Sequence, residues 1–455
     1  MVQGSREIIY RKKLIVRGPI PLLQKLMILY LAVWSIAPPL EIDMIFRLAA
    51  LGCAGGWFIL DMIKGLRLRQ IHMFAILFIF LVVIVTIIEN EGEMSKLLKQ
   101  ISFFMLVMAF IMNYSYRNRW DELKMIVPLL LLLLIVFNIL TFRELLVDPT
   151  LSRKIVRADE EMYAYMRRGV GGYELIYSQV LMFPVILSWT INAFKNNKAL
   201  FAIGTGWTVS YIMLILNAGY SIAIVTTISA TLVFFFNRRE SIIPALIATL
   251  SLIILLVLLI GYVDPVREAL LEFFDGTKVA NKVRDIYDSL HGIEVADSIM
   301  DRWIRYKDSM LKNLEYPAFG SLWMAGNGGH SALMDTFAKY GWFGGVMFVK
   351  MYYCNALRIK RSANGSKQLR LANSMLVALI VVTLLDTVPY NMVFPVVIVV
   401  PIMLNDIEKW GGFDENSLDG ERSARRRLSK LIDKFRKPRR MGGGDGPTPW
   451  QPSGY

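Results

Sequence analysis

The chain has 455 residues, enough for about three soluble domains, yet 55% of its residues are hydrophobic and only 19% are charged. This composition is typical of a membrane protein and excludes an ordinary soluble globular chain. The net charge of +14 would suggest a nucleic-acid-binding protein if the charges were spread evenly, so their positions decide the interpretation. Cys53 and Cys354 form neither a CxxC pair nor a cysteine-rich metal site, and we predict no redox chemistry.

Apolar runs long enough to cross a bilayer as helices occur about twelve times. We place them at residues 26–40, 42–60, 71–88, 100–116, 125–142, 173–192, 199–217, 220–236, 241–262, 341–357, 371–388 and 392–405. Pro38, Pro39 and Pro389 divide longer apolar blocks, which leaves the count open by one pair of spans. The sequence therefore predicts an all-α polytopic membrane helix bundle.

Lys and Arg in the short connections predict the orientation, because basic residues stay on the cytoplasmic side. They gather in segment 1–25, in alternate turns and in the tail, whereas the intervening turns carry almost none. We therefore expect a multi-pass protein of the cytoplasmic membrane with both termini in the cytoplasm. Segment 1–25 lacks a small-residue cleavage site and predicts an uncleaved start-transfer sequence.

The basic tail is the remaining place where nucleic acid would bind. Within segment 406–441, residues 422–440 combine ten Lys and Arg with four large apolar residues, a pattern that favours an amphipathic helix on anionic lipid. We accordingly predict no nucleic-acid partner. Residues 442–455 are rich in Gly and Pro and predict a disordered tail.

Two segments predicted to lie outside the cytoplasm, 143–172 and 263–340, are too long to be turns. They separate three blocks of predicted spans, at residues 26–142, 173–262 and 341–405. Both contain basic residues on the side where such residues are normally scarce, which indicates an anionic substrate; the alternative is simple balancing by acids in the same loops. In the first segment, Arg167 and Arg168 are the least balanced and precede a glycine-containing run at 169–172 that is suited to phosphate.

The second segment predicts amphipathic helices at 264–290 and 297–314. An apolar stripe is expected on the later helix, with Arg302 and Arg305 flanking it; its members are Ile299, Trp303, Tyr306, Met310 and Leu314. A glycine-rich run then leads to His330, which is either an ordinary loop residue or a base that works with an arginine on phosphate. His72 and His291 are expected to be incidental.

These residues resemble the signature of the O-antigen polymerase and ligase superfamily. That signature has an Arg, an aromatic residue four positions later, Pro-x-x-Gly after the same helix, a His-Asn or His-Ser that starts a helix, and Gly-x-x-Gly opening the next span. The matching positions here are Arg302, Tyr306, Pro317 with Gly320, His330 with Ser331, and Gly341 with Gly344.

The resemblance implies a metal-independent glycosyltransferase of GT-C type without a cofactor. Its donor would be an oligosaccharide on undecaprenyl pyrophosphate, and its acceptor a sugar hydroxyl at the outer membrane face. Arg302 would bind the pyrophosphate and His330 would activate the hydroxyl, with Arg305, Arg167 and Arg168 as weaker contacts. Further partners would be a chain-length regulator and a flippase of the same pathway.

Two departures from the signature leave alternatives open. The turn at residues 217–221 lacks the arginine that many members carry there, so a second phosphate contact must come from elsewhere or be absent. His330 followed by Ser331 favours a capsule or exopolysaccharide polymerase, whereas an O-antigen ligase, which transfers polymer to lipid A-core, favours His-Asn. A lipid-linked oligosaccharide flippase is the alternative outside the enzymes, but only Arg47 and Lys350 lie well inside the predicted spans.

Overall fold

The computed structural model describes residues 20–63, 70–89, 98, 101, 120–148, 151–155, 160–218, 220–236, 241–293, 299–322, 324, 328–363, 366–386 and 393–410. Three expected features lie outside these residues: nearly all of the span at 100–116, the basic helix at 422–440 and the tail at 442–455. The same holds for residues 1–19 of the basic N-terminal segment.

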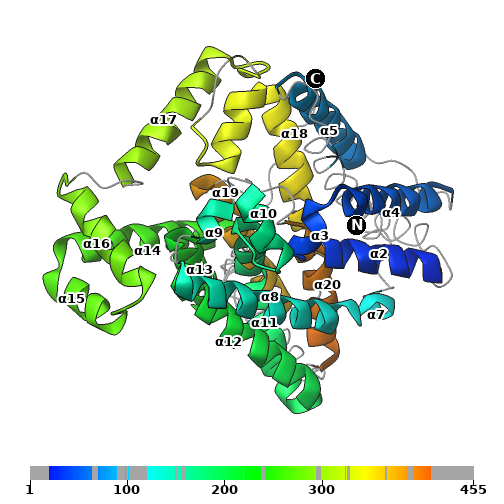
Figure 1. Ribbon diagram of the computed structural model, residues 1–455, viewed down its shortest axis with the longest axis horizontal. Coiled ribbons are helices and arrows are strands. Elements are labelled where there is room, and N and C mark those ends of the chain that lie inside the picture. Colours follow the sequence, from blue (N-terminus) through cyan, green and yellow to red (C-terminus); the bar gives the residue numbers. More distant parts are fainter. Residues whose placement is uncertain are drawn as a thin grey trace, which may run out of the picture. The chain divides into compact units, whose positions relative to one another are not determined.

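Every regular element in the described residues is helical (Figure 1). The helices, in chain order, are α2 (Leu22–Trp34), α3 (Pro38–Ile42), α4 (Met44–Ile63), α5 (Gln70–Glu89), α7 (Trp120–Leu123), α8 (Ile126–Val147), α9 (Leu151–Lys154), α10 (Glu160–Arg167), α11 (Tyr173–Asn196), α12 (Lys198–Ala218), α13 (Ser221–Phe236), α14 (Ile242–Tyr262), α15 (Asp264–Phe273), α16 (Lys278–Leu290), α17 (Ile299–Glu315), α18 (Ala332–Ser362), α19 (Ser366–Leu385) and α20 (Val393–Trp410).

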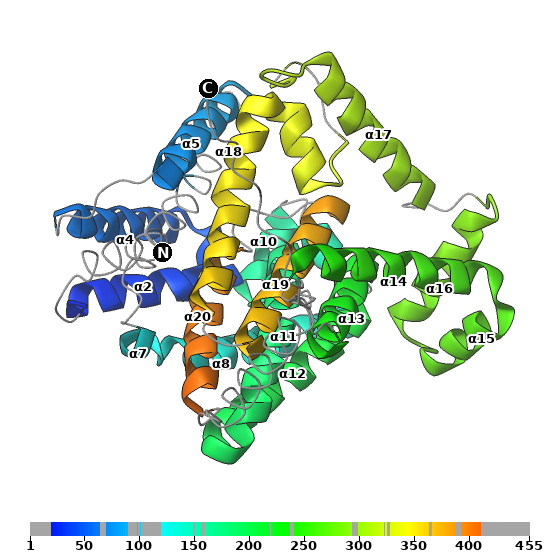
Figure 2. The same ribbon diagram turned by 180° about the vertical axis from the view of Figure 1, so that it is seen from behind.

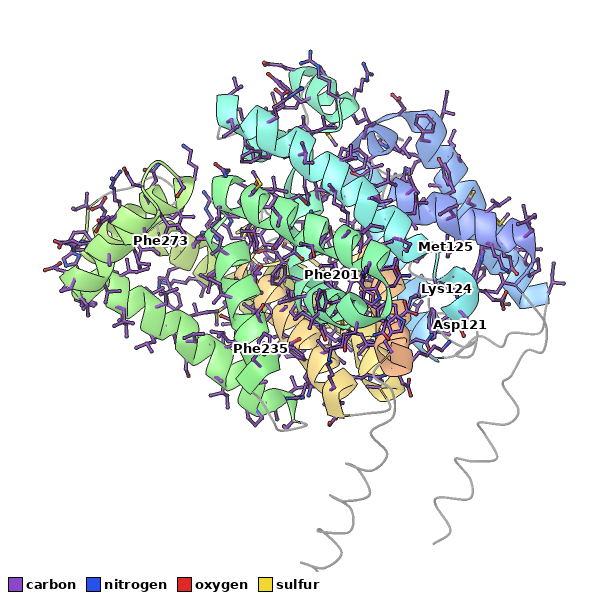
Figure 3. All side chains as sticks on the ribbon, turned by 90° about the horizontal axis from the view of Figure 1, so that it is seen from below. Asp121, Lys124, Met125, Phe201, Phe235 and Phe273 are labelled. Atoms are coloured by element: carbon purple, nitrogen blue, oxygen red, sulfur yellow. The ribbon has the colours of Figure 1, made fainter. Side chains whose placement is uncertain are left out.

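Five helical stretches in the described part of the chain are long and apolar enough to cross a membrane: Trp120–Val147, Tyr173–Asn196, Lys198–Ala218, Ile242–Tyr262 and Ser366–Leu385. Many large apolar side chains are also exposed, both on these helices and on shorter apolar ones such as α13, which carries Phe235 (Figure 3). Such surfaces are stable in lipid and unfavourable in water. The chain is therefore a helical membrane protein.

Helix α11 forms the centre of the core. It packs against α12, α13, α19 and α20, and most of its side chains are buried. Its sequence explains this position, because Ser178, Gln179, Ser188 and Thr190 interrupt the apolar run. Polar groups in a membrane helix avoid lipid and turn toward neighbouring helices, where they find hydrogen-bond partners.

One group of these polar residues, which we call the amide cluster, joins α8, α11 and α12. The side-chain amides of Asn138 and Gln179 donate to each other, with both nitrogen–oxygen distances at 2.8 Å. Asn138 also donates to the hydroxyl of Ser210 at 3.2 Å, and Gln179 to the carbonyl of Leu175 at 2.9 Å. Asn138 and Gln179 are fully buried, so the cluster fixes the three helices in register without any charge.

The long helix expected at 264–290 is in fact two helices. Helix α15 ends at Phe273 and α16 begins at Lys278, with Gly276 at a φ of 72° between them. Gly276 adopts this left-handed conformation readily, and it reverses the chain. Phe273 lies at the surface in this region (Figure 3), and 80% of it is exposed. The prediction of a single helix was wrong because the amphipathic period continues through the turn.

Helix α17 contacts α18, and α18 consists of two segments (Figure 2). The break is at Gly341, whose φ of 62° and ψ of −166° are not helical. The sequence predicted this break, since the helix starting near Ser331 was expected to end where Gly341 opens a new apolar run. The first segment of α18 follows His330 directly, so this part of the fold determines where that side chain lies.

Candidate functional site

Helix α17 turns its polar side toward the rest of the protein. Arg302, Tyr306 and Ser309 occupy one face, at the i, i+4 and i+7 positions that adjoin on a helix. Ser309 is 1% exposed, and the hydroxyl of Tyr306 donates to the carbonyl oxygen of Leu385 at 2.7 Å. This face therefore connects α17 to the end of α19.

The apolar stripe expected on this helix does not face the protein. Trp303, Met310 and Leu314 are 62%, 53% and 72% exposed, and of the stripe members whose side chains the structure describes only Tyr306 points inward. This orientation has a physical reason: buried carboxylates opposite the helix require donors, which Arg302 and Ser309 supply and apolar side chains do not.

Arg302 lies near a buried carboxylate, with which it interacts electrostatically. Asp386, which directly follows α19 and is 3% exposed, accepts a short hydrogen bond from the hydroxyl of Tyr177 on α11. Burial alone would lower the pKa of Arg302, but the negative charge of Asp386 and the nearby phenols outweigh it and raise that pKa above its ordinary value. We call Tyr177, Arg302 and Asp386 the Asp386 cluster.

One nitrogen of the Arg302 guanidinium makes no hydrogen bond to the described residues. Its Nη1 atom is buried and has no hydrogen-bond partner among the residues that the structure describes. A guanidinium has five N–H donors in a fork that matches the oxygens of carboxylate or phosphate. A buried donor without a hydrogen-bond partner raises the free energy of the folded protein. An anionic ligand that accepted a hydrogen bond from this nitrogen would remove that penalty.

A second carboxylate, Asp335 on α18, fixes the loop that carries His330. Asp335 accepts from the hydroxyl of Ser309 at 2.5 Å and from the backbone N–H groups of Gly329 at 3.2 Å and Ser331 at 3.0 Å. His330 lies between the two backbone donors, so both of its neighbours are held by one side chain. The loop also approaches α17 closely: a Cβ atom at Gly328 would lie 2.1 Å from the carbonyl oxygen of Arg305.

The first turn of α18 attaches the same loop to the end of α19. The hydroxyl of Ser331 caps the helix by accepting from the N–H of Met334 at 3.2 Å, and it lies 3.2 Å from the carbonyl oxygen of Thr383, to which it donates. The N–H of Ala332 donates to the carbonyl of Asp386 at 2.9 Å. Asp386 thus contacts the start of α18 through its backbone and interacts electrostatically with Arg302, which brings the segments of Arg302 and His330 together.

A further connection, which we call the glycine clasp, joins residues 317–322 to residues 338–343. The N–H groups of Ser321 and Leu322 donate to the carbonyls of Ala338 and Lys339 at 2.9 and 2.8 Å, and those of Trp342 and Phe343 to Pro317 and Ala318 at 2.8 and 3.1 Å. Gly320 and Gly341 have φ values of 75° and 62°, and a Cβ on either would lie 2.4 Å from the backbone nitrogen of the other. The Pro-x-x-Gly and Gly-x-x-Gly sequences therefore meet, and only glycine fits at their contact.

Two further tyrosines, Tyr173 at the start of α11 and Tyr220 just before α13, adjoin the Asp386 cluster through Tyr177. The ring of Tyr173 stacks on that of Tyr177, with centroids 5.7 Å apart, and lies 4.6 Å from that of Tyr220. Tyr177 and Tyr220 are buried, whereas Tyr173 is half-buried. Tyr173 therefore presents an aromatic surface next to the cluster, of the kind that packs against the apolar face of a sugar ring or an isoprenoid chain.

The other predicted arginines have different surroundings. Arg305 is exposed, and its side chain makes no hydrogen bond or ion pair within the described ranges. Arg167 lies 3.8 Å from the carboxylate of Asp43, and Arg168 lies over the ring of Tyr165 at 5.6 Å. These contacts direct Arg167 and Arg168 to α3 and α10, and none joins them to Arg302.

Sequence reasoning missed Tyr177 and Asp386. Each had a signal: Asp386 is a carboxylate at the end of an apolar run, and Tyr177 follows Tyr173 by one helical turn. Nothing in the sequence pairs two residues separated by 209 positions.

Among the described residues, no group of three or more His, Cys, Asp or Glu side chains is placed to hold a metal ion. The side chains that could do chemistry at this site are therefore a half-buried arginine, two carboxylates, phenols and the imidazole of His330. A guanidinium next to a carboxylate and a phenol suits recognition of an anionic group, and an imidazole is a base near neutral pH. Comparison with protein-family models and with curated proteins finds no match for this chain.

Proposed function

We propose that this protein is a polymerase of lipid-linked oligosaccharide repeat units for a bacterial surface polysaccharide. It acts at the outer face of the cytoplasmic membrane, within a GT-C-type bundle of about twelve spans whose termini are both cytoplasmic. The observation that carries the proposal is the meeting of the Arg302 and His330 segments at Asp386, with one arginine nitrogen lacking a partner among the described residues.

The proposed reaction is a displacement at the anomeric carbon of the donor glycan. Arg302 binds the pyrophosphate of the undecaprenyl donor, and His330 takes the proton from the acceptor hydroxyl. The new bond forms between that oxygen and the anomeric carbon as the bond from this carbon to the pyrophosphate oxygen breaks. The electron pair leaves with undecaprenyl pyrophosphate, and Arg302 stabilises the charge. A single displacement inverts the anomeric configuration.

The remaining residues support these two. Asp386 orients Arg302, and Asp335 with Ser331 holds the backbone on both sides of His330. A rigid loop matters because a shift of about 1 Å between a base and its proton costs roughly 10²-fold in rate. Tyr173 offers a surface for the sugar or the lipid next to this point.

The decisive experiment is His330→Ala in a strain that lacks the native gene. We expect normal amounts of membrane protein and no polymer, because the hydroxyl loses its base. Polymer of normal length would contradict the assignment. A matched control is His291→Ala, since His291 is exposed and bonds the carbonyl of Tyr287 at 2.9 Å, and this variant should make normal polymer.

The deletion strain itself separates the polymerase from its two alternatives. Single repeat units on the acceptor indicate a polymerase. Intact polymer that remains on undecaprenyl pyrophosphate indicates a ligase. Single units confined to the cytoplasmic side of the membrane indicate a flippase.

A further inference from the structure

From Trp303 to Leu314 the outward face of α17 is exposed and mainly apolar, with Lys307 as its one charged member. Trp303, Ile304, Met310, Leu311 and Leu314 are 62%, 49%, 53%, 51% and 72% exposed. At about 100° per residue these five side chains cover an arc of about 120°. A mainly apolar arc of this size on an outside helix is rare in water and indicates an interaction surface.

This apolar face is distinct from the other two faces of the helix. The arc begins roughly 40° from Tyr306, so it adjoins the face that carries Arg302 and Ser309. The third face holds charged residues, among them Arg305, Asp308 and Lys312. The face with Arg302 and Ser309 meets the candidate site, and the charged face meets water. The apolar face would therefore meet a third, apolar medium.

Exposed aromatic side chains also occur where the chain passes from α17 to the part of α18 that enters the predicted span 341–357. Phe319, in the glycine clasp, is 61% exposed and contacts the ring of Phe343, with centroids 5.7 Å apart. Trp342 and Phe343 are 58% and 47% exposed. The exposed aromatic residues thus form a connection from α17 to a helix whose surroundings are lipid in the proposed topology.

The level of the membrane surface is marked at the same place. Lys339, two residues before Gly341, forms an ion pair with Glu89 at the end of α5, with a nitrogen–oxygen distance of 2.5 Å. In membrane proteins, charged side chains gather at the lipid headgroups, and Trp side chains gather just inside them. Trp342 follows Lys339 by three positions, which matches this order. The glycine clasp and the adjoining end of α17 are therefore at the membrane surface.

We propose that α17 is an interfacial helix, with the face from Trp303 to Leu314 inserted among the acyl chains of the bilayer. Lipid is the occupant rather than a second protein because the chain runs from α17 directly to exposed aromatic residues, Phe319, Trp342 and Phe343, at the start of a predicted span. Lys307, within the arc, is compatible with this placement, since its long side chain lets the ammonium group reach the headgroups. The inference concerns the position of the helix and does not depend on the proposed reaction.

An inserted α17 would fix the depth of the candidate site relative to the membrane surface. An inserted apolar face would hold Arg302 close to the headgroup layer, because the two faces of α17 adjoin. An anionic group attached to a membrane lipid lies in the same layer. The helix would thus present its guanidinium at the level where such a group is found.

The test uses the 455-residue chain in lipid nanodiscs, with Cys53→Ala and Cys354→Ala as background and an environment-sensitive fluorophore at one new cysteine. Met310→Cys and Leu314→Cys probe the apolar face, and Asp308→Cys is the matched control on the charged face of the same helix. Each labelled protein is exposed to a phospholipid with a nitroxide near its carbonyl, and to aqueous iodide.

We expect the lipid nitroxide to quench positions 310 and 314 at least threefold more than position 308, and iodide to show the reverse order. Equal iodide quenching at all three positions would overturn the proposal. Shielding of 310 and 314 from both quenchers, together with crosslinking between copies, would overturn it in favour of a protein interface. Leu314→Cys is an independent second probe if Met310→Cys disturbs folding, and the readout requires no catalytic activity.

Discussion

The amide cluster and the Asp386 cluster are both buried groups of polar side chains that join distant helices, yet they are built differently. In the amide cluster, Asn138 and Gln179 satisfy each other with two bonds of 2.8 Å, and every group is neutral. In the Asp386 cluster, the groups are an arginine, a carboxylate and a phenol, and Arg302 retains a buried nitrogen without a partner in the described part of the chain.

The difference teaches how to separate polar residues that pack helices from those available to a ligand. A neutral, reciprocally bonded pair has no capacity left and contributes modestly to stability. Burying a charge costs desolvation free energy, and incomplete pairing leaves that cost uncompensated. Such a group is therefore expected where it also serves a function such as ligand binding. The Asp386 cluster is therefore the better candidate for function, and the amide cluster is its internal control.

The largest expected effect comes from Arg302→Lys, which keeps the charge and removes the planar fork. We expect polymer synthesis by the purified protein to fall by roughly 10²- to 10³-fold, as when one preorganised donor is lost from a transition-state site. The measurement is the rate of chain extension on a lipid pyrophosphate-linked oligosaccharide.

The matched control is Arg305→Lys, one turn away on the same helix but exposed. It should retain nearly full activity, because its side chain has no described partner. An equal loss in both variants would show that general positive charge matters, and the contrast drawn for Arg302 would fail.

Gly341→Ala tests whether the glycine clasp maintains the Asp386 cluster. The new Cβ would lie 2.4 Å from the backbone of Gly320 at a φ of 62°, and we expect a loss of about 3 kcal/mol in the free energy of unfolding. Gly276→Ala is the control: its φ is 72° but nothing lies within 4 Å, so only the backbone strain of about 1 kcal/mol should remain. Thermal unfolding in nanodiscs gives both values, and equal losses would mean that the close contact is unimportant.

Gln179→Leu breaks the amide cluster and leaves Asn138 with one partner fewer. We expect a loss of about 1 to 2 kcal/mol in stability, the usual range for a hydrogen bond between membrane helices. The rate of chain extension per folded molecule should not change. A large fall in that rate at unchanged stability would place the amide cluster within the functional machinery and remove the distinction between the two clusters.

The smallest effect is expected for Tyr306→Phe, which removes the bond of 2.7 Å to the carbonyl of Leu385 and about 1 kcal/mol of stability. Burial raises the pKa of Tyr306, so the folded protein holds this proton more tightly than the unfolded chain does. The associated stability is present below the ordinary tyrosine pKa of about 10 and is lost as the pH rises through the higher folded value. Unfolding measured from pH 8 to 11 should show a weaker alkaline decline in the phenylalanine variant.

Much of the backbone around the site was predictable from local sequence. Pro317 ends the helix that carries Arg302, Ser331 caps the next one, and Gly341 interrupts it, as the residue types suggest. Each of these features depends on the conformational preference of a single residue or on one turn of helix. Such local preferences can be inferred from residue type alone.

The orientation of α17 and the partners of Arg302 were not predictable in the same way. The spacing of Trp303, Met310 and Leu314 reveals an apolar face, but periodicity does not say whether that face meets protein or another apolar medium. Tyr177, on α11, and Asp386, directly after α19, are far apart in the sequence, and only tertiary packing brings them close to Arg302.

The glycine clasp has a consequence for how this sequence can change over time. Its four connecting bonds are made entirely by backbone atoms, so the side chains of Ala318, Phe319, Trp342 and Phe343 can drift without loss of the connection. Gly320 and Gly341 cannot, and neither substitution is rescued by the other because each added atom would lie 2.4 Å from the backbone of the opposite segment. In distant descendants of this chain, two glycines about twenty residues apart should outlast almost every side chain around them.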